Sequence, residues 1–234
     1  MKYLSIGNNP KTIKGDKKGE FLTAIMYLQP SLALCPMSAL AKCHDACLNL
    51  AGRGAMSPIQ TARARKSAAY TADPIAFVDQ LKADIMKAIN KASKKGARLA
   101  VRLNGTSDIA WENMKGANGQ TLMADFPDVQ FYDYTKLPNR KVPINYHLTV
   151  SYSGANQAYA AKVNKTSHNI AVVFRGALPA HFNGRPVVDG DLTDLRFLDP
   201  HGVVVGLKAK GPAKKDQSGF VVDVSANTIA IEVK

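Results

Sequence analysis

Short runs of consecutive apolar residues recur along the chain, and polar segments separate them. The first run, Glu20–Leu28, ends before Pro30, as expected of a buried strand. Continuously apolar runs of this kind are typical of strands that are buried on both faces of a parallel sheet. We therefore predict core strands at Glu20–Leu28, Leu99–Leu103, Val129–Tyr134, His147–Ser151, Ile170–Phe174 and Val203–Leu207.

Between these runs the apolar positions follow a helical period instead. The clearest helix is predicted to begin at Asp73-Pro74 and to end near Lys95, just before Gly96. Ser57 is predicted as the N-cap of a second helix, with Pro58 at its first position. This second helix extends to about Tyr70, and further helices are predicted at Cys43–Ala51 and Ala155–Val163.

Strands that alternate with helices or long loops indicate the α/β class with a largely parallel sheet. We predict a partial or complete parallel β/α barrel, with a closing C-terminal hairpin made from Phe220–Val224 and Thr228–Val233. The chain is predicted to form a single domain. Residues 1–19 are a basic N-terminal segment, residues 20–211 the barrel-like core, and residues 212–234 the hairpin.

Polar side chains follow the ends of the predicted strands. In α/β barrels the carboxyl ends of the strands meet on one rim, and the chemistry gathers there. We therefore expect a cofactor or substrate to be bound by residues at these strand ends: Asn104, Thr106, Ser107, Asp108, Tyr134, Lys136, Ser151 and Lys208.

Several of these segments also have simpler interpretations. Residues 104–108 fit a capped turn equally well, with Asp108 as the N-cap of a helix from Ile109. The Asp189-Gly190-Asp191 segment resembles a cation-binding loop only loosely, and a hairpin turn is the favoured interpretation. Residues 208–211 fit either an anion-binding turn or a solvated basic turn.

The chain has three cysteines, Cys35, Cys43 and Cys47, all within thirteen residues directly after the first predicted strand. An odd, clustered set with no cysteine elsewhere argues against a disulfide framework and favours metal or iron–sulfur ligation. Three cysteines that bind a [4Fe–4S] cluster leave one iron open to a further ligand. Zinc is the alternative, with a fourth ligand required from a histidine such as His44. Buried cysteines that only pack are the remaining interpretation.

Charge and composition limit the partners and the location. The 234 residues include 31 Lys and Arg against 18 Asp and Glu, a formal net charge of +13. This excess would attract nucleic acid or a nucleotide as a partner, but the basic residues are spread along the chain, and a solvated basic surface is the favoured interpretation. No apolar run is long enough for a membrane span, and the N-terminus lacks a secretory signal. We expect a cytoplasmic protein that does not bind membranes. No P-loop, dinucleotide-binding glycine motif or Ser/His/Asp constellation is present.

A series of motifs between about residues 11 and 222 resembles a family of bacteriophage proteins, the gene product eighty-eight-like proteins. The motifs stand in this order: K-T-I-K-G, Y-L-Q-P-S, C-L-N-L-A-G-R-G, A-R-A-R-K-S, V-R-L-N-G-T-S-D-I-A-W-E, F-P-D-V-Q-F-Y-D-Y-T-K, N-Y-H-L-T-V-S, D-G-D-L-T-D-L-R-F-L-D-P and V-G-L-K-A-K-G. These phage proteins distantly resemble radical S-adenosylmethionine enzymes.

The resemblance implies a partial β/α barrel with a cluster after the first strand. The cluster ligands would be Cys35, Cys43 and Cys47, although the spacing C-x7-C-x3-C departs from the C-x3-C-x2-C of the radical enzymes, and no Gly-Gly-Glu-like segment is present. The implied function is a phage-encoded iron–sulfur enzyme that uses S-adenosylmethionine on a small molecule, nucleotide or nucleic acid. The alternative is a non-enzymatic, nucleic-acid-associated phage protein with a structural metal or cluster.

Overall fold

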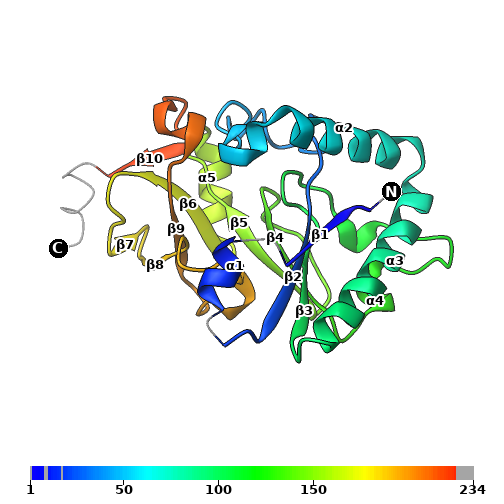
Figure 1. Ribbon diagram of the computed structural model, residues 1–234. Coiled ribbons are helices and arrows are strands. Elements are labelled where there is room, and N and C mark those ends of the chain that lie inside the picture. The colour runs from blue at the N-terminus through cyan, green and yellow to red at the C-terminus, as the bar shows by residue number, and fades with distance from the viewer. Residues whose placement is uncertain (1, 8–9, 17, 225–234) are drawn as a thin grey trace.

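The computed structural model describes residues 2–7, 10–16 and 18–224. Its strands form one sheet in the order β1-β2-β3-β4-β5-β6-β9-β8-β7, and β10 pairs with β6 off this path (Figure 1). The strands are β1 (Leu4–Ile6), β2 (Phe21–Met26), β3 (Arg98–Arg102), β4 (Gln130–Thr135), β5 (Tyr146–Ser151), β6 (Asn169–Arg175), β7 (His181–Phe182), β8 (Arg185–Asp189), β9 (Val204–Lys208) and β10 (Val221–Asp223).

Five α-helices and five short 3-10 helices connect these strands within the described residues. The α-helices are α1 (Pro10–Gly15), α2 (Ser57–Ala72), α3 (Pro74–Ser93), α4 (Leu122–Asp125) and α5 (Gln157–Asn164). The 3-10 helices are η1 (Leu48–Leu50), η2 (Gly52–Ala55), η3 (Trp111–Asn113), η4 (Arg196–Leu198) and η5 (Gly211–Lys215).

The sheet is mostly parallel and open. Every neighbouring pair from β2 to β6, and onward through β9 to β8, is parallel. The outer strands β1 and β7 are antiparallel to β2 and β8, and in the described part of the chain they do not pair with each other. The predicted α/β class with a largely parallel sheet is therefore confirmed, whereas closure into a barrel is not.

Helix α3 covers the sheet where β1, β2 and β3 lie side by side, and it builds the larger core with them. Its residues Phe77, Val78, Leu81 and Ile85 are buried, as the predicted helical period requires. The ring of Tyr3 stacks on Phe77 with centroids 4.0 Å apart, which joins the strand β1 end to the helix. This packing fixes the direction of β2 and β3, and hence the place where both strands end.

The predicted helix at Cys43–Ala51 is wrong. The amide of Cys47 bonds to the carbonyl of His44, and the amide of Cys43 to that of Ser38, so the segment is a series of turns. Lys42, directly before the segment, has a φ of 51°, so the chain enters the segment through a left-handed residue. Because each turn changes the chain direction, the thiols are placed by the turns and not by one helix face.

Three further expectations are corrected. Met56, not Ser57, is the N-cap of α2. Asp108 caps no helix, because the helical turn after it, η3, has Ala110 at its N-cap. Strand β10 pairs in parallel with β6, and the second strand of the predicted hairpin, Thr228–Val233, lies outside the described residues. The sequence gives no prediction of β1, β7, β8 or α1.

Candidate functional site

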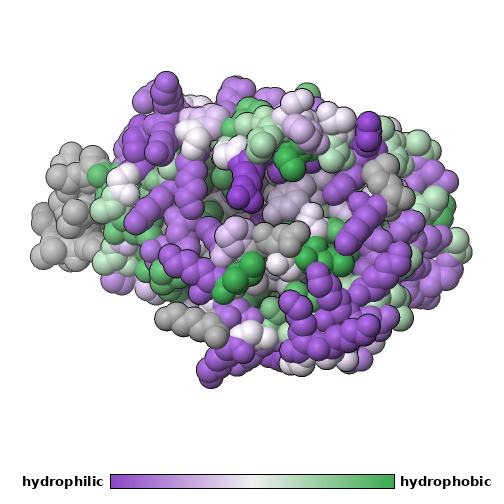
Figure 2. All heavy atoms as spheres, viewed as in Figure 1, coloured by the Kyte–Doolittle hydropathy of each residue, from purple (hydrophilic) through white to green (hydrophobic). Residues whose placement is uncertain are grey.

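A cavity of about 430 Å³ opens at the carboxyl ends of the parallel strands. In Figure 1 the segment after β2 and helix α2 lie along the top of the molecule, above these strand ends. Figure 2 shows this face hollowed near its centre, with hydrophilic side chains around the hollow. All eleven residues predicted for the site line this one cavity: Cys35, Cys43, Cys47, Asn104, Thr106, Ser107, Asp108, Tyr134, Lys136, Ser151 and Lys208.

The cysteine segment, residues 31–50, is tied to the strand ends by hydrogen bonds from outside the segment. The carbonyl of Leu34 accepts from the amide of Asp108 at 2.8 Å, and that of Ala41 accepts from the hydroxyl of Ser153 at 2.7 Å. The carbonyl of Lys42 accepts from the hydroxyl of Ser218 at 3.3 Å. These bonds satisfy backbone groups that the turns leave unpaired, and they hold the segment over the cavity.

The three thiols are free and partly buried. Burial, and after it the charges of Asp108, Cys47 and Cys43, raise the pKa of Cys35 to about 12. Burial also raises the pKa of Cys43 and of Cys47. All three thiols line the same cavity, and a buried thiol stays protonated unless a cation replaces the proton.

The donor set does not fit a closed zinc site. Among the described residues, no group of three His, Cys, Asp or Glu side chains is placed to hold one metal ion. His44 is exposed, and no histidine lines the cavity. A cubane cluster requires a wider spacing of its ligands than a single metal ion does, because each cysteine binds a separate iron and the three sulfurs surround a larger volume. Three thiols around one cavity fit this second arrangement.

The turn after β3 is held by the side chain of Asn104, which is 2% exposed. Its Oδ1 accepts from the Ser107 hydroxyl at 2.8 Å, the Ile109 amide at 2.9 Å and Trp111 Nε1 at 3.1 Å. Its Nδ2 donates to the Ile109 carbonyl and to Asp133 Oδ2. Because these bonds engage both ends of the amide, Asn104 shapes the rim of the cavity.

Gly105 follows, and it lets this turn approach the end of β2. A Cβ atom at Gly105 would lie 2.4 Å from the Met26 carbonyl oxygen and 2.6 Å from the Tyr27 ring. Only glycine fits at this distance. Next to it, the hydroxyl of Thr106 donates to the carbonyl of Leu28 at 2.5 Å. The turn is therefore joined to the chain that leads into the cysteine segment.

Asp108 and Asp133 are buried carboxylates near this turn. Burial raises the pKa of Asp108, and the hydrogen bond from the Lys136 amide, 2.8 Å from Oδ2, opposes part of the rise. Burial raises the pKa of Asp133 to about 7, although the Tyr146 hydroxyl donates to it at 2.7 Å. Arg140 Nη1 lies 3.6 Å from Asp108 Oδ1, and Arg140 also forms a bidentate pair with Glu112. The guanidinium of Arg140 is therefore the counter-ion of both Asp108 and Glu112.

Lys136, directly after β4, brings an ammonium group into the cavity. It is 9% exposed, its Nζ donates to Ser151 Oγ at 2.7 Å, and it lies 4.8 Å from the centroid of the Phe220 ring. Burial lowers its pKa, and the nearby Cys43, Asp108, Cys47 and Cys35 oppose the change. The groups near this ammonium that can carry negative charge are thus the three cysteines and Asp108.

Four basic lining residues were not predicted as site residues. Lys11 of α1 and Lys210 both contact Asp191 Oδ1, at 2.8 Å and 2.6 Å. Arg102, the last residue of β3, pairs with Asp194 at 2.9 Å and lies over the ring of Tyr134. The fourth is Arg63 of α2. The A-R-A-R-K-S motif contains Arg63, but the pattern of apolar residues in this helix does not predict that Arg63 is buried in a cavity.

Asp191 pairs with two lysines at the cavity, Lys11 and Lys210. Burial raises its pKa, but the hydrogen bonds from Lys11 and Lys210 outweigh this and hold the pKa at about 2. Residues 189–191 do form a turn, in which the Leu192 amide donates to the Asp189 carbonyl at 3.4 Å, but it is not a hairpin turn, because β8 and β9 pair in parallel. Lys208 is exposed at the rim, and its amide donates to Asp191 Oδ2 at 3.2 Å.

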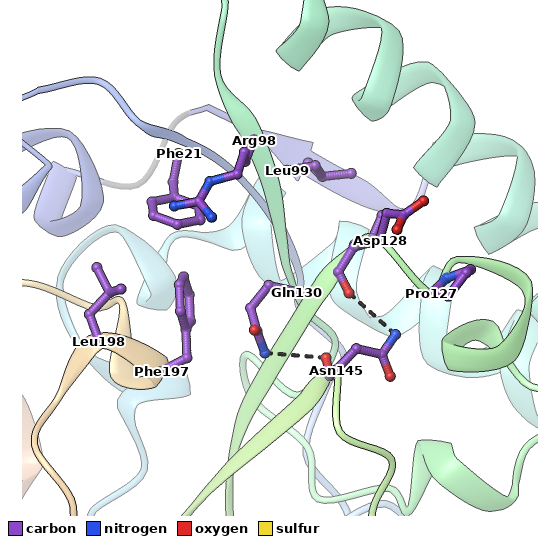
Figure 3. A pocket seen from close by; sticks show the side chains of 10 residues that line it. Phe21, Arg98, Leu99, Pro127, Asp128, Gln130, Asn145, Phe197 and Leu198 are labelled. Atoms are coloured by element: carbon purple, nitrogen blue, oxygen red, sulfur yellow. Dashed lines mark hydrogen bonds between the residues drawn. The ribbon is translucent and has the colours of Figure 1, made fainter.

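A smaller cavity of about 210 Å³ lies at the opposite end of the sheet (Figure 3). The guanidinium of Arg98 lies 4.4 Å from the centroid of the Phe21 ring, and Phe197 packs edge-on against the same ring. Gln130 donates to the Asn145 carbonyl at 3.2 Å. None of the predicted site residues lines this cavity.

A family model described as Gene product 88 matches residues 2–224, which agrees with the predicted resemblance to a bacteriophage protein family. No curated protein and no solved structure matches the chain. The likeness to radical S-adenosylmethionine enzymes therefore stays a prediction. No helix in the described residues is long and apolar enough to cross a membrane.

Proposed function

The chain belongs to the Gene product 88 family, and we propose that its large cavity holds a [4Fe–4S] cluster beside an S-adenosylmethionine-type cofactor. Cys35, Cys43 and Cys47 bind three of the irons, and the fourth iron is left for the cofactor. The substrate is a small molecule, a nucleotide or nucleic acid. When bound, such a cluster supplies one electron for reductive cleavage of the sulfonium cofactor.

The observation that carries this proposal is the convergence of the three thiols on a single cavity at the carboxyl ends of parallel strands. Ligands gather at this end of open and closed α/β sheets alike. The thiols approach the cavity from separate turns of one anchored segment, which suits a cluster that needs each sulfur on a different iron.

The other lining residues have roles that follow from their contacts. Asn104 and Gly105 fix the turn that borders the cysteine segment. Asp108 holds the backbone after β4 through the Lys136 amide, and Ser151 Oγ accepts from the Lys136 ammonium. The cavity also keeps exposed groups such as Lys208 at its rim, where an anionic substrate would enter.

Metal and sulfide analysis of anaerobically purified and reconstituted protein tests the proposal. We expect brown protein with iron and acid-labile sulfide in equal amounts, near four of each per chain. Cys35→Ala, Cys43→Ala and Cys47→Ala should each lose most of the iron. Leu32→Ala is the matched control, because Leu32 lies in the same segment and is 63% exposed. A colourless wild-type protein with stoichiometric zinc would refute the proposal.

A structural cluster in a nucleic-acid-associated protein is the second candidate, and the net charge of +13 favours it. On this account the cluster only holds the cysteine segment in place. We expect binding to single-stranded DNA whose affinity falls steeply with salt. Cluster removal would then unfold the segment, while addition of S-adenosylmethionine would change nothing.

A further inference from the structure

Two cations in the large cavity are buried without a carboxylate. Arg63 is 8% exposed and Lys136 is 9% exposed. Among the described residues, neither has an Asp or Glu oxygen within 4.0 Å. Both line the cavity that the three thiols line.

Other buried arginines of this protein are neutralised. Arg102 pairs with Asp194 at 2.9 Å, Arg140 with Glu112 at 2.5 Å, and Arg196 with Asp199 at 3.3 Å. Within the described residues, Arg63 thus differs from these three arginines, and Lys136 shares its lack of a carboxylate partner.

Neutral groups surround the guanidinium of Arg63. Its Nη1 donates to Asn49 Oδ1 at 2.5 Å and to the Asn49 carbonyl at 3.2 Å, and the group lies 5.1 Å from the centroid of the Tyr27 ring. Its Nε has no hydrogen-bond partner within the described residues. Burial lowers the pKa of Arg63, and Tyr27 and then Cys47 oppose the change. The thiol of Cys47 is thus one of the few groups near Arg63 that can carry negative charge.

The same is true of Lys136. One hydroxyl and one aromatic ring contact its ammonium, which has three N–H donors. Removing such a charge from water is unfavourable, and a nearby anion offsets this cost better than a hydroxyl or a ring does. The side chains that act most on Lys136 are Cys43, Asp108, Cys47 and Cys35.

We infer that Arg63 and Lys136 are the counter-charges of the cluster when it is bound to the three thiolates. This inference rests on the proposed function. A cubane cluster with three thiolates is negatively charged, and it gains a further negative charge on reduction. Nearby cations stabilise the reduced form more than the oxidised form, so they raise the reduction potential. The two side chains therefore retain the cluster and make it easier to reduce.

Redox titration of the cluster, followed by EPR, tests the inference. Arg63→Gln and Lys136→Gln should each lower the reduction potential, Lys136→Gln by more because its ammonium is coupled to all three thiols. Arg63→Lys keeps the charge and should restore most of the potential, which a purely structural role through Asn49 would not allow. Arg65→Gln on the same helix and Lys214→Gln near the rim are exposed controls and should leave the potential unchanged.

Denaturation of the cluster-free proteins covers the case in which a variant does not retain its cluster. Without the cluster both cations are uncompensated, so Arg63→Gln and Lys136→Gln should be as stable as the wild type or more stable. A cluster with the wild-type potential in both variants would overturn this inference alone. Cluster-free variants that are both less stable than Arg65→Gln would also overturn it. A wild-type protein that binds no cluster would overturn the proposed function together with it.

Discussion

Asn104 is the side chain on which the rim of the cavity depends most, and Asn104→Ala tests this. The substitution removes five hydrogen bonds at once, to Ser107, the amide and carbonyl of Ile109, Trp111 and Asp133. The partners are buried, so water does not replace the lost bonds. At about 1 kcal/mol for each bond, the free energy of unfolding should fall by about 3–5 kcal/mol.

Urea denaturation followed by tryptophan fluorescence measures this loss. Trp111 is the single tryptophan of the chain, it is fully buried, and its Nε1 donates to Asn104, so it reports on the same network. Asn118→Ala is the matched control, because Asn118 also makes side-chain hydrogen bonds but is exposed. It should lower the free energy of unfolding by less than about 1 kcal/mol. Equal losses in the two variants would refute the role given to Asn104.

Three further predictions concern the segments around the cavity. Gly105→Ala should destabilise the protein by about 1–3 kcal/mol in urea denaturation, because the new Cβ meets the Met26 carbonyl; an unchanged midpoint would contradict this. Lys42→Gly should stabilise it by about 0.5 kcal/mol, since Lys42 has a φ of 51°, whereas Lys94→Gly, at a right-handed position, should destabilise it. Asp191 should titrate near pH 2 by NMR, because folding lowers its pKa. The carboxylate therefore contributes about 1 kcal/mol to the free energy of unfolding above pH 4, and this contribution is lost as the pH falls to 2. Asp191→Asn should lack this contribution. A pKa near 3.8 would contradict the lysine contacts.

The strands were predictable where burial leaves a continuous apolar run. Phe21–Met26 is buried at every position, and its sequence shows this directly. Leu4–Ile6 is too short to give such a signal, and its pairing with β2 depends on distant packing against α3. Arg185–Asp189 is only partly buried, so its residues do not alternate or cluster in a recognisable way.

The eleven predicted residues were found by one rule, that chemistry gathers at the carboxyl ends of parallel strands, and all of them line one cavity. That rule could not find Arg63, which reaches the cavity from helix α2. The rule also missed Arg102, because in the sequence this residue lies inside the predicted strand Leu99–Leu103 and not after its end. The path of the cysteine segment was not predictable either, because its turns are fixed by hydrogen bonds from Ser153 and Ser218, more than a hundred residues away.

The most direct test of the account is the EPR spectrum of the reduced, reconstituted protein with and without S-adenosylmethionine. If the fourth iron faces the cavity, the cofactor should bind beside it and change the spectrum of the cluster. The same addition to Cys43→Ala should change nothing, because that variant should hold no intact cluster. An identical spectrum for the wild-type protein with and without the cofactor would contradict the account and favour a purely structural cluster.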